Sequence, residues 1–198
     1  MKKIISIILL CCWAFMANAQ NPQTEKPASS SAASVEKSIF GVQTGFLGIW
    51  VHNEFRISNQ IALRTEVGFD ASFVPGDSYN KTIYFMAPVF MVEPRWYYNL
   101  NKRKAKSKRI DGNSGNFISL QTSYIPNWFV ISNNPYEWVR RQLWVMAMWG
   151  IRRNIGKHFN YEAGVGMGYR FYLKGKNSNT TEGSDWMPNI LLRIGYRF

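Results

Sequence analysis

The chain is poor in the residues on which thiol, metal and imidazole chemistry depend. Its 198 residues include only two cysteines and two histidines. Cys11 and Cys12 both lie in the N-terminal apolar run, so a chain cleaved after that run holds no cysteine and can form no disulfide. His52 and His158 are too far apart in sequence to have the spacing of a metal pair. We therefore expect no metal site and no cofactor.

Catalytic patterns are equally scarce. The sequence contains no G-x-S-x-G, Walker or zinc pattern. The glycines of residues 164–168 form G-x-G-x-G, but a nucleotide loop joins a strand to a helix, whereas these glycines lie inside one alternating segment. A lipid-modifying enzyme would need a histidine, a serine and a carboxylate. His52, Ser72 and Asp70 could supply these groups, but nothing marks them, and we expect neither an enzyme nor catalytic residues.

Long hydrophobic runs are absent beyond the N-terminus. Lys2 and Lys3 precede the apolar run Ile4 to Trp13, and Ala17-Asn18-Ala19 follows it, which is the layout of a cleaved secretory signal. A transmembrane anchor is the first alternative, but the run is much shorter than the ~20 residues of a membrane-spanning helix. A lipoprotein is the second, but Leu9-Leu10 lacks the small residue expected before a lipidated cysteine. We predict a signal peptide over 1–19 and export.

A polar, basic protein remains after cleavage. Residues 20–37 are rich in Ser, Ala and Pro and are predicted to form a disordered periplasmic lead-in. Loss of Lys2 and Lys3 leaves 22 basic residues against 12 acidic ones, so the net charge falls from +12 to +10. Such a charge suits nucleic acid, anionic lipid or acidic glycan, and export excludes nucleic acid as a partner.

From Ile39 onward the hydropathy pattern has period two, which indicates β-strands. Phe159 to Leu173 alternates strictly over the whole segment, and Trp186 to Phe198 repeats the pattern at the C-terminus. Soluble strands usually have about five or six residues, whereas a tilted membrane strand needs roughly 9–11. The chain has 16% aromatic residues but a mean hydropathy of only −0.24. Membrane strands explain both values, because only alternate side chains face lipid and the others stay polar. A secreted β-sandwich would have a similar average.

Six further segments bring the predicted number of strands to eight. They are 39–46, 49–57, 61–73, 83–98, 117–129 and 138–152. With an even number of strands and the N-terminus in the periplasm, the connections 58–60, 99–116 and 153–158 face the periplasm. The prediction is an all-β, eight-stranded antiparallel transmembrane β-barrel over 38–198, an up-and-down meander in the outer membrane. At this length we expect eight strands rather than ten.

Charged residues recur on the polar phase of these strands or beside it. An eight-stranded barrel is just wide enough to be filled by side chains, and buried charges there need partners. We expect a salt-bridged lumen, and the alternatives are an ion pathway or a catalytic carboxylate pair. The predicted lumen charge network comprises Glu54, Arg56, Arg64, Glu66, Glu93, Arg95, Glu162, Arg170, Arg193 and Arg197.

The strongest charge feature is a basic run in the 99–116 connection. In this topology it faces the periplasm, where anionic headgroups or cell-wall polymers would bind it, although many charge runs are only solvated loops. The basic periplasmic loop comprises Lys102, Arg103, Lys104, Lys106, Lys108 and Arg109.

Aromatic residues gather at the predicted strand ends, where membrane barrels carry interfacial girdles, and a carbohydrate-binding platform is the alternative. Trp96, Tyr97, Tyr98, Trp128, Trp138, Trp144 and Trp186 are the candidates. The chain also ends on Phe198 with Tyr196 two positions earlier, which resembles the C-terminal signal that barrels present to their assembly machinery.

Several segments resemble a known family. These are Phe40 to Gly48, Glu93 to Asn99, Ser114 to Phe117, Gly150 to His158 and Leu192 to Phe198. They resemble outer-membrane β-barrel proteins of flavobacterial and related Bacteroidetes genomes and, more loosely, small porin-family barrels of the OmpA and OmpX type. The resemblance implies location and fold but little about function, because a fold does not determine function.

The expected function is that of a closed outer-membrane barrel with a structural or surface-interaction role. The expected partners are outer-membrane lipids and the barrel assembly machinery. A narrow channel or a transport barrel for small molecules is the first alternative, and an outer-membrane lipid-modifying enzyme is the second.

Overall fold

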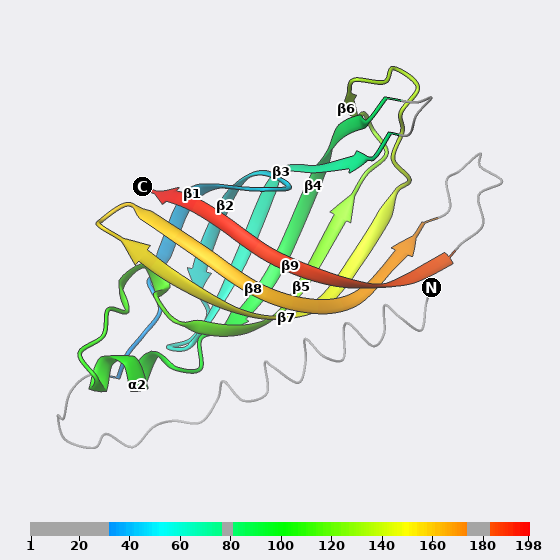
Figure 1. Cartoon of the computed structure of the whole chain (residues 1–198). Coiled ribbons are helices and arrows are strands. Elements are labelled where there is room, and N and C mark those ends of the chain that lie inside the picture. The colour runs from blue at the N-terminus through cyan, green and yellow to red at the C-terminus, as the bar shows by residue number, and fades with distance from the viewer. Residues whose placement is uncertain (1–31, 77–80, 174–182) are drawn as a thin grey trace. The chain divides into compact units, whose positions relative to one another are not determined.

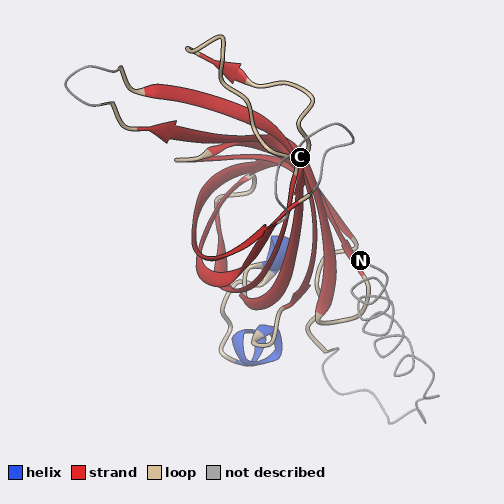
Figure 2. Cartoon of the chain, turned by 90° about the vertical axis from the view of Figure 1, so that its right-hand side faces the viewer, coloured by secondary structure: helices blue, strands red, loops and turns tan. Residues whose placement is uncertain are grey.

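The computed structural model describes residues 32–76, 81–173 and 183–198, which form one compact unit. The unit is an antiparallel barrel whose strands run obliquely around a common interior (Figures 1 and 2). The long strands are β1 (Ser38–Gly45), β2 (Gly48–Arg56), β3 (Ile61–Val74), β4 (Ile83–Trp96), β5 (Asn116–Ile125), β7 (Gln142–Ile155), β8 (Phe159–Tyr172) and β9 (Gly183–Arg197).

The sheet is a closed meander of these eight strands. Each long strand pairs with its neighbours in sequence, and β1 pairs with β9 to close the ring, with Gly41 opposite Arg197 and Gly45 opposite Arg193. The predicted all-β eight-stranded barrel is therefore confirmed, whereas the membrane crossing stays a prediction. The short strand β6 (Ile131–Ser132) pairs with the far end of β4 and is no member of the ring.

Three predicted strands end earlier or start later in the structure by two or more residues. β5 ends at Ile125 rather than at Phe129, because Pro126 has no N–H to donate to the ladder. β7 begins at Gln142 rather than at Trp138, and the loop between β5 and β7 contains β6. The predicted strand 83–98 is also shorter, because β4 ends at Trp96.

One end of the barrel is covered by the connection between β4 and β5. This connection contains helix α2 (Leu100–Ala105) and the 3-10 helix η2 (Asp111–Asn113), which the period-two pattern did not predict. We call this the α2 end. The β2–β3 turn, the β7–β8 turn and the C-terminal residue lie at the same end, because the strands alternate in direction.

The predicted lead-in, residues 20–37, is described only from residue 32. Val35 is fully buried and its N–H donates to the Asn59 carbonyl at 2.9 Å. Glu36 N–H donates to Asn113 Oδ1 at 2.7 Å. This part of the chain is thus packed against the α2 end before β1 begins. Residues 20–31 and the predicted signal over 1–19 lie outside the described residues.

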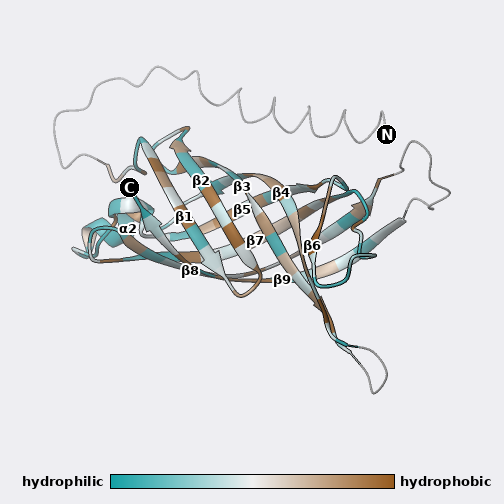
Figure 3. Cartoon of the chain, turned by 90° about the horizontal axis from the view of Figure 1, so that it is seen from above, coloured by the Kyte–Doolittle hydropathy of each residue, from teal (hydrophilic) through white to brown (hydrophobic). Residues whose placement is uncertain are grey.

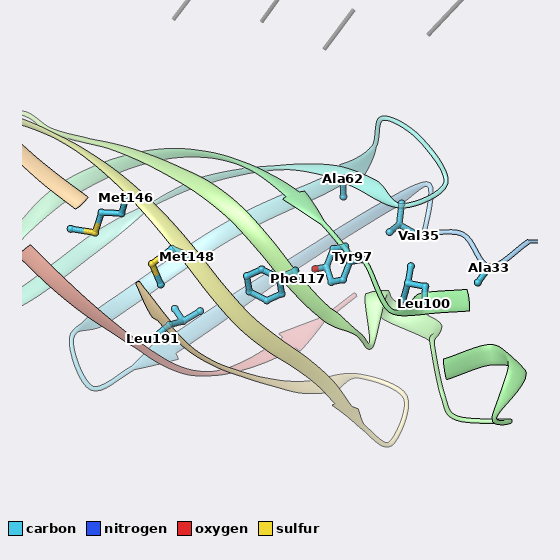
Figure 4. Close-up of a cluster of buried hydrophobic side chains, with 9 residues drawn as sticks. All are labelled: Ala33, Val35, Ala62, Tyr97, Leu100, Phe117, Met146, Met148 and Leu191. Atoms are coloured by element: carbon cyan, nitrogen blue, oxygen red, sulfur yellow. The ribbon is translucent and has the colours of Figure 1, made fainter. Parts of the chain in front are cut away.

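Hydrophobic side chains fill the interior where charges do not. Tyr97, Leu100 and Phe117 are fully buried near the α2 end, and Met146 and Met148 lie further along the barrel (Figure 4). Glycine makes room for one of these rings: a Cβ on Gly150 would lie 2.5 Å from the Phe117 ring. The interior is therefore packed by side chains, as expected of a barrel of this size.

Candidate functional site: a charged network inside the barrel

The candidate site is a cluster of charged side chains in the half of the barrel near α2. Strand register puts opposite charges side by side on the inner face. Glu54 of β2 lies opposite Arg64 of β3, and Arg64 lies opposite Glu93 of β4. On the other wall, Glu162 of β8 lies between Arg152 of β7 and Arg193 of β9. Cross-strand pairs of opposite charge stabilise a sheet, so the register and the network support each other.

Two ion pairs cross the interior. Arg64 of β3 and Glu162 of β8 approach to 3.4 Å, and Arg152 of β7 and Glu54 of β2 approach to 2.9 Å. These strands stand on opposite sides of the eight-stranded ring. All four side chains are fully buried, with 0% exposure. The cross-section at this level is therefore occupied by ion-paired side chains.

Arg95 of β4 contacts the carboxylates of Glu54 and Glu162 and also that of Glu93. Its guanidinium lies 3.1 Å from Glu162, 3.6 Å from Glu54 and 2.8 Å from Glu93. The central carbon of the same guanidinium lies over the Phe117 ring, 4.3 Å from its centroid. An arginine can satisfy several partners at once because its planar fork carries five N–H donors.

Glu66 extends the network toward the other end. It accepts from Arg64 at 2.6 Å and from Arg193 at 2.8 Å. The Arg193 guanidinium also lies over the Trp50 ring at 3.8 Å, and Trp50 Nε1–H donates to Asp70 at 2.8 Å. In this cluster four glutamates face four arginines, and this balance offsets the desolvation that burial imposes on each charge.

Neutral polar groups complete the coordination of the carboxylates. Tyr97 Oη–H and Asn113 Nδ2–H donate to Glu54 Oε1 at 2.9 and 2.6 Å, and Ser119 Oγ–H donates to Glu93 at 2.5 Å. Because Tyr97 and Asn113 belong to the connection that covers the α2 end, this connection is hydrogen-bonded into the lumen network.

Three of the ten predicted network residues lie elsewhere. Arg56 is the last residue of β2 and is exposed at the α2 end. Arg197 donates to the Lys157 carbonyl and pairs with Asp111 at 2.9 Å, outside the lumen. Arg170 pairs with Asp185 at 2.7 Å at the opposite end. All three keep the inward phase of their strands but stand too close to a strand end to reach the centre.

The sequence analysis also missed members of the network. Arg152 was predicted as the final residue of its strand, but β7 continues to Ile155 and places Arg152 inside. The sequence pattern could have placed Arg152 in the interior, because Arg152 has the same alternation phase as Met146, Met148 and Gly150. Gln43, which accepts from Arg64 at 2.6 Å and donates to Asn160 at 2.9 Å, carries no charge and gave no signal.

The groups considered for lipid chemistry do not come together. His52 lies opposite Glu66 in the β2–β3 register, whereas Asp70 lies opposite Gly48 at the far end of β2. Ser72 is exposed, and His52 is 1% exposed with no hydrogen-bond partner for either ring nitrogen among the described residues. Within the same part of the chain, no group of three or more potential ligands is arranged to hold a metal ion.

The outer face of the strands is largely apolar, in contrast to the inner face. Along β9, Ile190, Leu192 and Ile194 are 70%, 61% and 52% exposed, whereas Leu191 is 7% exposed. Figure 3 shows hydrophobic and hydrophilic residues interleaved along the strands, and mostly hydrophilic residues around α2. None of the helices in the described ranges is both long and apolar enough to cross a membrane.

Aromatic side chains border the apolar face at the α2 end. Phe198 packs on Phe40 at 5.6 Å and on Tyr196 at 5.3 Å between ring centroids, and Tyr196 packs on Phe159 at 5.4 Å. On the other side of the ring lie Trp96, Tyr98 and Trp149, and Trp149 Nε1–H donates to Tyr98 Oη at 2.9 Å. We call these seven aromatic residues the α2-end girdle.

The girdle prediction needs two corrections. Trp96, Trp128, Trp138 and Trp186 are about half exposed or more, but Tyr97 is fully buried and bonded to Glu54. Trp144 is half-buried against the hydrophobic cluster of the interior rather than exposed on the outer face. Both residues share the inward phase of their strands, which their aromatic character does not show.

Comparison of the chain with protein-family models, with curated proteins and with solved structures gives no match in any of the three. The family resemblance drawn from the sequence therefore stays a prediction. The fold and the charged interior carry the functional argument.

Proposed function

We propose that this chain is an integral outer-membrane β-barrel with a closed interior and a structural or surface-interaction role. The single observation that carries the proposal is the reversed arrangement of its side chains. Charges are buried in the centre, whereas large apolar residues such as Ile190, Val165 and Val67 lie exposed on the outer face. A water-soluble barrel needs the opposite arrangement, and a bilayer favours this one.

The charged network supports the proposal of a closed interior. The ion pairs Arg64–Glu162 and Arg152–Glu54, which cross the lumen, are 0% exposed, and the connection between β4 and β5 is hydrogen-bonded to Glu54 at the α2 end. A conducting pore of this size would need a continuous aqueous path past Arg64 and Glu162. We therefore favour the closed barrel over a narrow channel, and we favour both over a lipid-modifying enzyme.

Measurements of membrane integration and of conductance test this proposal. The protein from isolated outer membranes should migrate faster on a gel when unheated than when boiled, and it should resist alkaline extraction. Recovery of the processed chain in soluble periplasmic extract would contradict it. In planar bilayers the purified barrel should give no reproducible conductance steps, and such steps would favour the channel instead.

A further inference from the structure

The charge of the described residues is concentrated at one end of the barrel. The lumen network is balanced, with four glutamates and four arginines. The end opposite α2 holds four basic side chains and three acidic ones in the described ranges. The α2 end holds eleven basic side chains and two acidic ones. Nearly all of the net positive charge of the described residues thus lies at the α2 end.

Several elements build this basic rim. Six of its residues belong to the basic loop already defined, residues 102–109, which folds as α2 and the turn that follows it. The other five are Lys37 before β1, Arg56 at the end of β2, and Arg153, Lys157 and Arg197 around the β7–β8 turn and the C-terminus. The rim is therefore a property of the fold and not of one charge run.

The two acidic residues neutralise only a small part of the rim. Asp111 forms ion pairs with Arg109 and Arg197, and Glu36 accepts a hydrogen bond from the Gly112 N–H at 3.1 Å. Lys102, Lys106 and Lys108 of the loop are exposed, and so are Lys37 and Lys157. Five ammonium groups thus face the surroundings at this end.

The position of the rim identifies its partner. The α2-end girdle lies between the rim and the apolar outer face, and aromatic girdles in membrane barrels lie at the level of the headgroups. Cations immediately beyond such a girdle reach the phosphate layer. We infer that the basic rim binds the headgroups of anionic phospholipids in the leaflet nearest α2. This inference rests on the proposed membrane barrel.

Lipid selectivity in a reconstituted bilayer tests the inference. The purified protein is inserted into phosphatidylcholine vesicles that contain trace spin-labelled phosphatidylglycerol or spin-labelled phosphatidylcholine. Spin-label spectra then give the relative association of each lipid with the barrel. The unaltered protein should prefer phosphatidylglycerol, and the preference should fall as salt is raised, because surface charges are screened.

Matched double variants locate the site. Lys106→Gln with Lys108→Gln should reduce the preference for phosphatidylglycerol, by up to about fivefold for each lysine. The control, Lys81→Gln with Arg140→Gln, removes the same charge from the opposite end and should leave the preference unchanged. Heat-modifiable migration verifies that each variant is folded in the vesicle.

The outcomes separate the inference from the proposal on which it rests. A folded, inserted barrel without preference for phosphatidylglycerol, or with equal loss in both double variants, overturns the inference alone. Binding of a soluble polyanionic glycan without any lipid preference assigns the rim to a cell-wall polymer and also overturns it. Failure to form a heat-modifiable barrel in any vesicle overturns the proposed function together with the inference.

Discussion

At the scale of single residues, the interior depends on carboxylates, such as Glu162, that pair with several arginines at once. Glu162 lies within 3.4 Å of Arg64, Arg95 and Arg152, and all four side chains are buried. Removing one partner of a buried ion pair is more harmful than removing both, because the remaining charges stay desolvated and unpaired. Glu162 is therefore the residue whose neutralisation should disturb the barrel most.

The substitution Glu162→Gln should lower the free energy of unfolding by about 3–5 kcal/mol. Denaturant titration of the barrel in detergent or vesicles, followed by tryptophan fluorescence, measures this change. Asp185→Asn is the control, because its ion pair with Arg170 lies at the exposed end of the barrel. Equal effects of the two substitutions would show that the lumen network contributes nothing specific to stability.

Outside the strands, Asp111 provides a dependence of stability on pH. The hydrogen bond from Arg109, followed by the charges of Arg109 and Arg197, holds the pKa of this carboxyl below its usual range. A group with a lowered pKa in the folded state stabilises that state at pH above the ordinary carboxyl pKa, about 4. This contribution is lost as the pH falls through the lowered pKa of the folded state.

Comparing Asp111→Asn with the unaltered protein across pH isolates this contribution. The variant should be less stable at neutral pH, and the difference should shrink below about pH 4 and vanish in stronger acid. A difference that stays constant down to the lowest pH would mean that Asp111 acts through packing rather than through its charge.

At the scale of elements, the sequence predicts the walls of the barrel better than its end. Strands such as β8 are recognisable because alternate residues face two different environments, and Phe159 to Tyr172 matches the predicted segment within one residue. The connection 99–116 has no such alternation. In the structure, the fold of the connection between β4 and β5 is determined by tertiary contacts of Tyr97, Leu100 and Asn113 that no local pattern encodes. The basic run, which the sequence alone could present as a solvated loop, thus belongs to the folded connection between β4 and β5 that covers the α2 end. We call this connection the cap.

Asn113 fastens this cap to two other elements. Its side chain donates to Glu54 at 2.6 Å and accepts from the Glu36 N–H at 2.7 Å, and its backbone has a φ of +59°. Asn113→Ala should cost about 1–3 kcal/mol by leaving buried groups without partners, in addition to backbone strain.

Limited proteolysis of the folded barrel measures the attachment of the cap, and cleavage in the connection between β4 and β5 should be faster in Asn113→Ala. The variant Asn113→Gly separates the two causes, because glycine removes the hydrogen bonds but tolerates the positive φ. Protection of both variants to the same degree as the unaltered protein would mean that Asn113 does not hold the cap.

At the scale of the whole molecule, the candidate site was only partly predictable. The inward phase predicted that Glu54, Arg64 and Glu162 would share an interior, but it could not show which residues meet across the ring. That information depends on register and shear, which place Arg64 near Glu162 although they are 98 residues apart. The phase also could not show where a strand reaches the rim, and for this reason Arg56 was misplaced.

The central claim is that the outer face of the strands meets hydrocarbon while the neighbouring residues meet a closed polar interior. Leu191 and Leu192 offer a matched test, because these adjacent residues are of the same type and are 7% and 61% exposed. Spin labels on Leu191→Cys and Leu192→Cys in reconstituted vesicles report their collisions with oxygen, which concentrates in hydrocarbon, and with a water-soluble nickel complex. We expect the label at 192 to collide readily with oxygen and rarely with nickel, and the label at 191 to be shielded from both. High nickel accessibility at 192 would contradict the account, because the outer face would then be in water.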